Sequence, residues 1–386
     1  MKGRSVVLLV LLIVVGLAGL VTGYAALSYR RLRVPDPTGA FTVGRMTLRW
    51  QDAARHETLG PAPGGPRQVV VAAWYPAVAG SGTETAYFPG LSAVATDLEL
   101  SGEVSALEVK AMPYVRSSER LDAQLDVSGA PYPVVILSPG NGTDVEFYDA
   151  VAGDLASHGY IVLGMNHPYD VAAVALADGT VARFAAGWEA QQASPPGRFV
   201  AQRIVERARD VMYLVDRIAR ADHGFPPERL SSMDAAHIGI MGHSLGGITA
   251  AEACRRDGRL DACLNIDGQQ AGGPFSTNPA VGPSWQAFMF LTKETVINSL
   301  MQERLAAISG GSWRVVVAGA RHDSFTDGPL LIPVPFPTRA DRVTATVRKY
   351  VVAFFDQTLH GQPSPILQQS STNADVTVEA HPRAGG

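Results

Sequence analysis

Residues 238–247 read Ile-Gly-Ile-Met-Gly-His-Ser-Leu-Gly-Gly, and this stretch decides the fold that we expect for the chain. A short apolar run leads into Gly-x-Ser-x-Gly, and a helix is predicted to open at Ser244. Gly242 and Gly246 let the strand and the helix cross closely, so that Ser244 is held exposed on a strained turn. The start of the helix offers unpaired backbone N–H groups to a developing negative charge. Ser244 is therefore the predicted nucleophile, and a glycine-rich packing turn is the alternative.

Short apolar runs alternate with helical patterns along most of the chain. Wholly apolar runs are typical of strands buried on both faces of a parallel sheet, and their alternation with helices implies right-handed crossover units. The predicted fold class is α/β, with a mostly parallel, doubly wound sheet and helices on both faces. Strands are predicted at residues 41–50, 68–75, 134–137, 160–165, 237–241, 262–266, 287–291 and 313–318, and helices at 144–157, 198–221, 295–308 and 343–359.

The base that activates the serine must lie further along the chain. A serine hydroxyl is a weak nucleophile, and in this type of fold the order is serine, then acid, then histidine. His322 follows the apolar residues 315–318, at the carboxyl end of a predicted strand. His360 ends a predicted helix, and His381 lies in a polar tail. His322 is the predicted base, and a structural loop histidine is the alternative.

The acid that orients this base is predicted to be Asp267. It directly follows the apolar residues 263–266, and a carboxylate at the edge of a buried strand is unfavourable unless it is paired. Asp323 is adjacent to His322 in the chain, and adjacent side chains rarely point at each other. Asp327 is a weaker candidate, and a loop-capping role is the alternative for Asp267.

Two backbone N–H groups are predicted to form the oxyanion hole. Residues 138–142 read Ser-Pro-Gly-Asn-Gly and follow a buried strand, with glycines that permit a close approach of the backbone. We expect the backbone N–H of Asn141 and that of Leu245 to be the two donors. Ser138 lacks an elbow and precedes Pro139, so it is a poor candidate for the nucleophile.

Four features of the sequence occur together in one known family. Residues 242–247 are similar to its nucleophile turn, and residues 154–162 to its helix-to-strand segment. Asp267 and His322, which lie 23 and 78 residues after Ser244, fall where the family keeps its acid and base. Residues 322–327 resemble its His-x-x-Phe-x-Asp stretch. The chain thus resembles the platelet-activating factor acetylhydrolases of the plasma and type II group, which are α/β-hydrolases.

The resemblance covers roughly residues 69–359 and implies a function. It implies a calcium-independent serine esterase that removes short or oxidised acyl chains from phospholipid-like or other small esters, without a cofactor. It also supports Asn141 as an oxyanion residue. The chain departs from the family at Pro139, where the family usually has histidine, and shows no clear family pattern at residues 76–131 and 269–285.

Two other functions remain open at this stage. A lipase or polyester hydrolase would use residues 76–131 and 269–285 as an apolar face for an interface. A non-catalytic, membrane-tethered binding protein would keep the scaffold but not the reaction, although the complete set of candidate side chains argues against this.

The first residues form an apolar segment. Lys2 and Arg4 precede residues 6–26, an uncharged run long enough to cross a hydrocarbon core of about 30 Å. An uncleaved membrane anchor is expected within residues 1–29, and a signal peptide cleaved near residues 23–25 is the alternative.

The orientation of this anchor is open. Arginines at 30, 31 and 33 favour a cytoplasmic body, whereas an apolar N-terminal segment behind a short basic stretch usually directs export. We expect the body to lie outside the cytoplasm, or to be secreted if the segment is cleaved. The expected organisation is a linker at 30–40, the hydrolase domain at 41–360 with an insertion near 76–131, and a disordered tail at 361–386.

The composition excludes several classes of partner. A net charge of −4 and no long basic run argue against nucleic-acid binding. The histidines are scattered without ligand spacing, so no metal is expected. Cys254 and Cys263 are the only cysteines, and two buried thiols are expected, with a disulfide as the alternative in an oxidising compartment.

Overall fold

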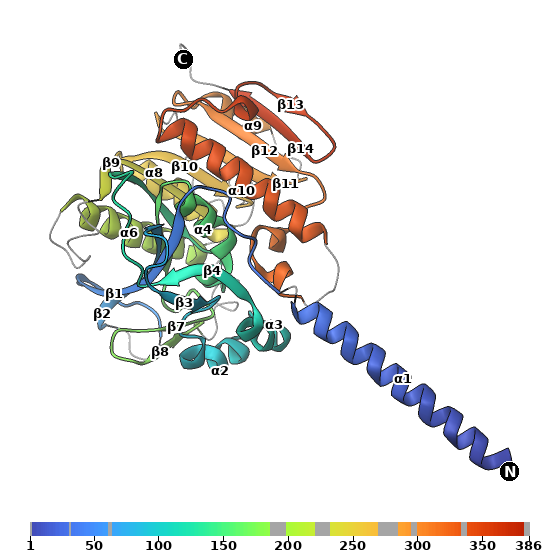
Figure 1. Cartoon of the computed structure of the whole chain (residues 1–386). Coiled ribbons are helices and arrows are strands. Elements are labelled where there is room, and N and C mark those ends of the chain that lie inside the picture. The colour runs from blue at the N-terminus through green and yellow to red at the C-terminus, as the bar shows by residue number, and fades with distance from the viewer. Residues whose placement is uncertain are drawn as a thin grey trace.

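The computed structural model describes residues 2–30, 32–60, 64–185, 198–220, 232–268, 285–294, 299–332 and 338–381. Among these residues, twelve strands form one sheet through the body (Figure 1). In their order across the sheet they are β13 (Ser371–Thr372), β14 (Val376–His381), β12 (Ser312–Val317), β11 (Ala287–Lys293), β10 (Leu260–Ile266), β9 (Met233–His243), β5 (Tyr132–Ser138), β6 (Ile161–Asn166), β2 (Pro66–Ala77), β1 (Thr42–His56), β4 (Arg116–Leu121) and β3 (Thr83–Ala86).

The centre of the sheet is parallel. Strands β6, β5, β9, β10, β11 and β12 are parallel neighbours, and every residue of β5 and β6 is buried, as their wholly apolar patterns predict. The chain first moves outward from β5 to β6, then returns to β9 and continues in the other direction to β12. The direction of winding therefore reverses between β5 and β9. In open α/β sheets, ligands bind at the carboxyl ends of the strands where this reversal occurs.

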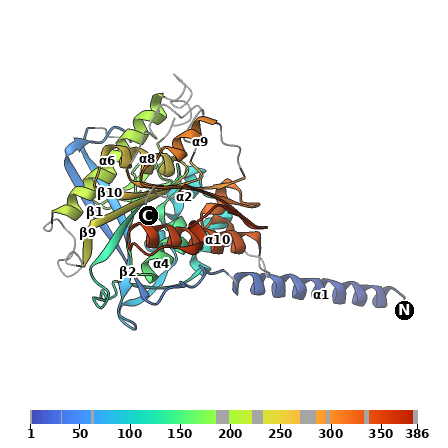
Figure 2. The same ribbon diagram turned by 90° about the horizontal axis from the view of Figure 1, so that it is seen from above.

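Helices cover both faces of the sheet (Figure 2). One face carries α6 (Arg198–Ala219), α8 (Leu245–Arg256) and α9 (Ser299–Ala306), whose Leu214, Ala250 and Leu305 belong to one apolar core. The opposite face carries α4 (Asp149–Ser157) and α10 (Arg339–Thr358), which bury side chains in a second core. The predicted doubly wound α/β fold is confirmed. Residues 295–298, predicted as helical, lie outside the described residues.

The segment predicted as an insertion extends one edge of the sheet and adds helices beside it. Strand β4 pairs in parallel with β1, and β3 pairs with β4. Between these strands lie α2 (Leu91–Ser101), α3 (Ala106–Ala111) and the 3-10 turn η1 (Met112–Tyr114). The α3 helix begins at a capping box, because the Ser105 side chain accepts from the Glu108 backbone while Glu108 accepts in return.

The N-terminal helix α1 (Lys2–Arg30) projects away from the body (Figure 1). By length and composition alone, its Leu12–Tyr29 segment could cross a membrane, and a signal sequence would meet the same criterion. At its end, the ring of Tyr29 lies edge-on to Tyr114, with 5.1 Å between the ring centroids. Beyond it, Leu32 and Val34 are buried in the region predicted as a linker.

The prediction of a disordered tail over residues 361–386 is wrong for much of that segment. Strand β14 pairs with β12 in an antiparallel register from Ser312↔His381 to Val317↔Val376, and β13 folds back on β14. Val376 and Val378 alternate with polar residues and are buried, which is the pattern of an edge strand with one covered face. Residues 382–386 lie outside the described residues.

The expectation of two free thiols is also wrong. Cys254, near the end of α8, forms a disulfide with Cys263 of β10. This disulfide joins the helix that begins after Ser244 to the strand that leads to Asp267.

Candidate active site

Ser244 lies on the sharp turn between β9 and α8. Its backbone has φ 55° and ψ −118°, a strained conformation for a residue with a side chain. The glycines on either side permit this turn. A Cβ on Gly242 would lie 2.2 Å from the Gly246 carbonyl oxygen, and one on Gly246 would lie 2.0 Å from that of Ser138. Side chains at these positions would separate the helix from the strands.

His322 lies in the first turn after β12, at the start of the 3-10 helix η3 (His322–Phe325). Its Nε2 lies 2.9 Å from Ser244 Oγ. The imidazole is about half exposed, with 49% of its side-chain surface accessible. The nitrogen that faces the serine can therefore exchange protons with a bound substrate.

Asp267 directly follows β10 and has a positive φ of 49°. Its Oδ2 lies 2.6 Å from His322 Nδ1. Thr292 Oγ1 donates to Asp267 Oδ1 at 2.7 Å, and Lys293 Nζ donates to Oδ2 at 2.8 Å. The structure thus brings the three side chains predicted from the sequence into one continuous chain of contacts.

These contacts keep Asp267 ionised. Burial alone would raise its pKa, but hydrogen bonds from His322, Lys293 and Thr292 outweigh burial and lower that pKa to about 2. A carboxylate can only accept, so His322 Nδ1 carries the proton and Nε2 is free to accept the proton of Ser244 Oγ. This arrangement has the donor order that general-base catalysis requires.

The two predicted oxyanion donors come from different elements. Leu245 is the first residue of α8, where backbone N–H groups have no partner inside the helix. Asn141 lies in the loop that follows β5 and lines the same pocket as Ser244. Gly142, the next residue, has φ 68°, and its N–H donates to the Asp170 carbonyl at 2.9 Å. This hydrogen bond joins the loop after β5 to the segment that follows β6.

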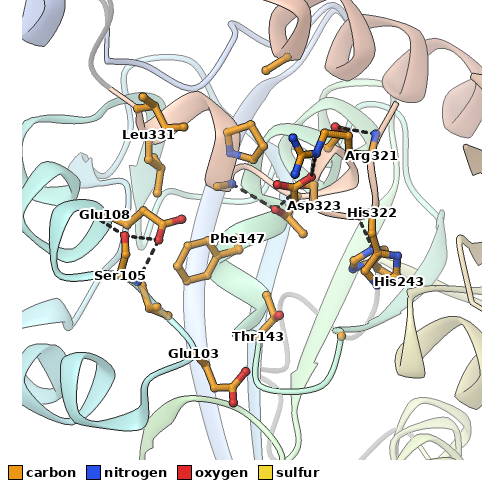
Figure 3. A pocket seen from close by; sticks show the side chains of 18 of the residues that line it. Glu103, Ser105, Glu108, Thr143, Phe147, His243, Arg321, His322, Asp323 and Leu331 are labelled. Carbon is orange, nitrogen blue, oxygen red and sulfur yellow. Dashed lines mark hydrogen bonds and ion pairs between the residues drawn. The ribbon is translucent and has the colours of Figure 1, made fainter. Parts of the chain in front are cut away.

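A cavity of about 760 Å³ opens above Ser244 and His322. Figure 3 shows Phe147 projecting into it between the α3 side, with Ser105 and Glu108, and the side that carries His243 and His322. The wall also includes Leu107 and Leu331. The insertion therefore forms part of the pocket, through α3 and the residues before it.

The other candidate residues have different surroundings. Asp323 is exposed and lies 3.8 Å from the Arg321 guanidinium. Asp327 is buried and accepts from the Tyr87 hydroxyl at 3.2 Å. Ser138 is fully buried, with its Oγ 3.0 Å from His167 Nε2. His360 packs against the ring of Tyr160, with the two ring planes tilted by 56°.

Sequence reasoning did not identify Thr292 and Lys293. The available signal was a polar pair at the end of the apolar strand β11, which lies beside β10 in the sheet. For metals, the residues that the structure describes contain no group of three or more His, Cys, Asp or Glu side chains able to hold an ion.

Comparisons with known proteins agree with this fold. The family model described as platelet-activating factor acetylhydrolase, isoform II matches residues 30–194, a segment that includes the loop carrying Asn141. A probable 1-alkyl-2-acetylglycerophosphocholine esterase from Arthroderma benhamiae is 22% identical over 88% of this chain and 91% of its own. The platelet-activating factor acetylhydrolase of the dog is 25% identical over 63% of this chain and 56% of its own.

A solved structure is similar over nearly the whole body. The ferulic acid esterase from Streptomyces cinnamoneus is 28% identical and covers 88% of this chain and 96% of its own, with a TM-score of 0.70. These comparisons do not favour a lipase, a polyester hydrolase or a non-catalytic binding protein.

The fold and these relatives define the class: the protein is a carboxylic-ester hydrolase with an α/β-hydrolase fold. Within that class it is similar to the platelet-activating factor acetylhydrolases, whose isoform II family model matches residues 30–194.

Proposed function

We propose that Ser244, His322 and Asp267 are the nucleophile, base and acid of this esterase. The observation that carries the proposal is the pair of contacts at His322, 2.9 Å to Ser244 Oγ and 2.6 Å to Asp267 Oδ2. Ser244 itself lies on a strained turn and lines the cavity.

The proposed reaction has two halves. Ser244 Oγ attacks the ester carbonyl carbon and passes its proton to His322 Nε2, while Asp267 stabilises the imidazolium that forms. The backbone N–H groups of Leu245 and Asn141 stabilise the negative oxygen. The tetrahedral intermediate then collapses, and the alcohol leaves with the proton from His322. In the second half, His322 takes a proton from water as the water oxygen attacks the acyl carbon. The bond from that carbon to Ser244 Oγ then breaks, His322 returns the proton to Oγ, and the acid is released.

The proposed substrates are esters with short acyl chains, phospholipid-like or small. Two relatives are named as a probable 1-alkyl-2-acetylglycerophosphocholine esterase and a platelet-activating factor acetylhydrolase. The cavity of about 760 Å³ has apolar side chains in its wall, such as Phe147 and Leu331. Esters of phenolic acids are a second candidate, because of the likeness to the ferulic acid esterase.

The full-length protein, assayed on a panel of esters, tests this proposal. The panel contains nitrophenyl esters from acetate to palmitate, a short-acyl and a long-acyl phosphatidylcholine, and methyl ferulate. We expect the highest kcat/KM on acetyl to butyryl esters. Preference for palmitate would contradict the short-acyl proposal, and preference for methyl ferulate would favour the second candidate.

A matched pair of variants tests the residue assignment. Ser244→Ala should lower kcat by about 10⁴-fold or more, because the nucleophile is lost while binding is kept. Ser371→Ala, a change of the same kind at an exposed position in β13, should leave kcat unchanged. Equal activity of the two variants would contradict the assignment.

We further propose that α1 anchors the enzyme to a membrane, with the body outside the cytoplasm. The length and composition of Leu12–Tyr29 support the anchor, and the disulfide between Cys254 and Cys263 supports an oxidising compartment. The mass of the mature chain, and protease treatment of spheroplasts from a bacterial host, test the proposal. Retention of residues 1–29 with a protease-accessible body is expected. A cleaved chain would contradict the anchor, and a protected body would contradict the orientation.

A further inference from the structure

His243, the residue before Ser244, has a partner for each of its ring nitrogens. Nδ1 lies 2.9 Å from the Tyr148 hydroxyl, and Nε2 lies 3.0 Å from the main-chain carbonyl oxygen of His322. The Tyr148 hydroxyl in turn accepts from the backbone N–H of Gly140 at 3.0 Å. The side chains of His243 and Tyr148 are buried, and Figure 3 shows His243 directly beside His322.

The chemistry of these groups determines the direction of every hydrogen bond. A carbonyl oxygen only accepts, so His243 Nε2 carries the proton, and Nδ1 of the neutral ring must accept from the Tyr148 hydroxyl. Burial and the nearby His322 imidazole lower the pKa of His243 to about 3, so the ring is neutral near pH 7. The Gly140 N–H, the Tyr148 hydroxyl, the His243 ring and the His322 carbonyl therefore form one series of hydrogen bonds with a single arrangement of protons.

The ends of this series lie in the two loops that the proposed reaction uses. Gly140 directly precedes Asn141, whose N–H is the proposed oxyanion donor after β5. The His322 carbonyl belongs to the proposed base after β12. No strand pairing joins these loops, because β9, β10 and β11 lie between β5 and β12 in the sheet. The side chains of His243 and Tyr148 bridge the gap.

We propose that His243 and Tyr148 are positioning residues that fix the distance between the oxyanion donor and the base. The inference rests on the proposed function of Ser244, His322 and Asn141. Both ring nitrogens of His243 are occupied, and the Tyr148 hydroxyl is bonded to His243 and Gly140, so neither residue has a polar atom left to take part in proton transfer. Their effect comes from geometry, because a displacement of about 1 Å in a catalytic group can lower a rate by about 100-fold.

Three variants of the full-length enzyme test this bridge, which is formed by the side chains of His243 and Tyr148. Tyr148→Phe removes only the hydroxyl, His243→Phe removes both ring contacts, and the double variant removes the whole series. We expect each single variant to lower kcat by roughly 10- to 100-fold with KM changed by less than about twofold. The double variant should lose no more than the worse single variant, because both changes break one unit.

Two further variants separate positioning from folding. Tyr75→Phe also removes a buried tyrosine hydroxyl, which donates to the Ala123 carbonyl at 2.8 Å, but it lies away from the site. It should lower the free energy of unfolding about as much as Tyr148→Phe and leave kcat unchanged. His243→Gln keeps an amide N–H for the His322 carbonyl and should recover part of the rate that His243→Phe loses.

The possible results are distinct. If Tyr148→Phe keeps the kcat of the wild type, if the two losses multiply in the double variant, or if His243→Gln recovers nothing, the positioning proposal is wrong. If Ser244→Ala keeps its activity, the proposed function fails instead, whatever the bridge variants show. A folded, inactive Ser244→Ala protein together with fully active bridge variants would overturn the bridge alone.

Discussion

Lys293 Nζ lies 2.8 Å from Asp267 Oδ2, the same oxygen that accepts a hydrogen bond from His322 Nδ1. The proposed acid thus has a cation beside it. Lys293 ends β11, the strand next to the one that precedes Asp267, so the parallel register brings the two groups together.

Replacement of this lysine should weaken both the fold and the reaction. In Lys293→Met, Asp267 loses one of the hydrogen bonds that lower its pKa, and its carboxylate becomes less well held. Because Lys293 is partly exposed, we expect a loss of about 1 kcal/mol in the free energy of unfolding and a severalfold lower kcat/KM. Denaturant titration and ester hydrolysis measure the two effects. Lys293→Arg keeps the charge and should behave like the wild type, and equal loss in both variants would argue against the role of the charge.

The disulfide should contribute stability without a part in the reaction. Cys254 and Cys263 are 9 residues apart in sequence, and a closed loop of this size stabilises a fold by about 2–3 kcal/mol through the unfolded chain. The double variant Cys254→Ala/Cys263→Ala should unfold at a lower temperature but keep kcat well below its transition. Thermal unfolding with and without reductant checks this. An unchanged midpoint in the double variant would contradict the prediction.

His167 predicts a pH dependence of stability. It is fully buried between Ser138 Oγ and Asp210 Oδ2, and burial lowers its pKa from 6.5 to about 4. Between these values the unfolded chain binds a proton that the folded protein does not, so this histidine costs stability as the pH falls from 6.5 toward 4.

The comparison must be made with a variant, because buried acids such as Glu119 and Asp144 have raised pKa values and act in the opposite direction. His167→Asn does not titrate. Relative to it, the wild type should lose roughly 2 kcal/mol between pH 7.5 and pH 5. Denaturant titrations of both proteins at the two pH values measure the difference. A constant gap between them would show that His167 is not buried in its neutral form.

The turn at Ser244 should not accept a methyl group at Gly246. The added Cβ would lie 2.0 Å from the Ser138 carbonyl oxygen and 2.5 Å from that of Pro139, and both are backbone atoms that cannot move away. We expect Gly246→Ala to lose about 3 kcal/mol or more and to be inactive. Gly258→Ala is the matched control, since its Cβ would meet only the Trp285 ring at 3.7 Å. Circular dichroism and ester hydrolysis distinguish the two, and an active Gly246→Ala protein would contradict this packing.

Local patterns in the sequence were sufficient to predict the elements that carry the site. Apolar runs mark β5, β9, β10 and β12, and the residues that follow them, Asn141, Ser244, Asp267 and His322, meet at one edge of the sheet because parallel strands end there. The periodicity predicted α6 to within about two residues.

The features that were missed depend on which strands are neighbours. Strand β14 has a short alternating pattern, and only its pairing with the open edge of β12 distinguishes it from a polar tail. Lys293 reaches Asp267 because of the register between β10 and β11. His243 contacts the carbonyl of His322, which lies 79 residues further along the chain. No local sequence pattern predicts either contact. The disulfide likewise forms only because α8 and β10 pack together and bring Cys254 next to Cys263.

The central claim is that Ser244 is the nucleophile, and a fluorophosphonate probe tests it most directly. The probe reacts with a serine only where a base activates it, and peptide mapping of the labelled, folded, full-length protein identifies the residue. The account predicts one label per chain, on Ser244, with esterase activity lost in proportion to labelling, and no label on Ser244→Ala. A label on another serine that abolishes activity, or an active enzyme whose Ser244 does not react, would contradict it.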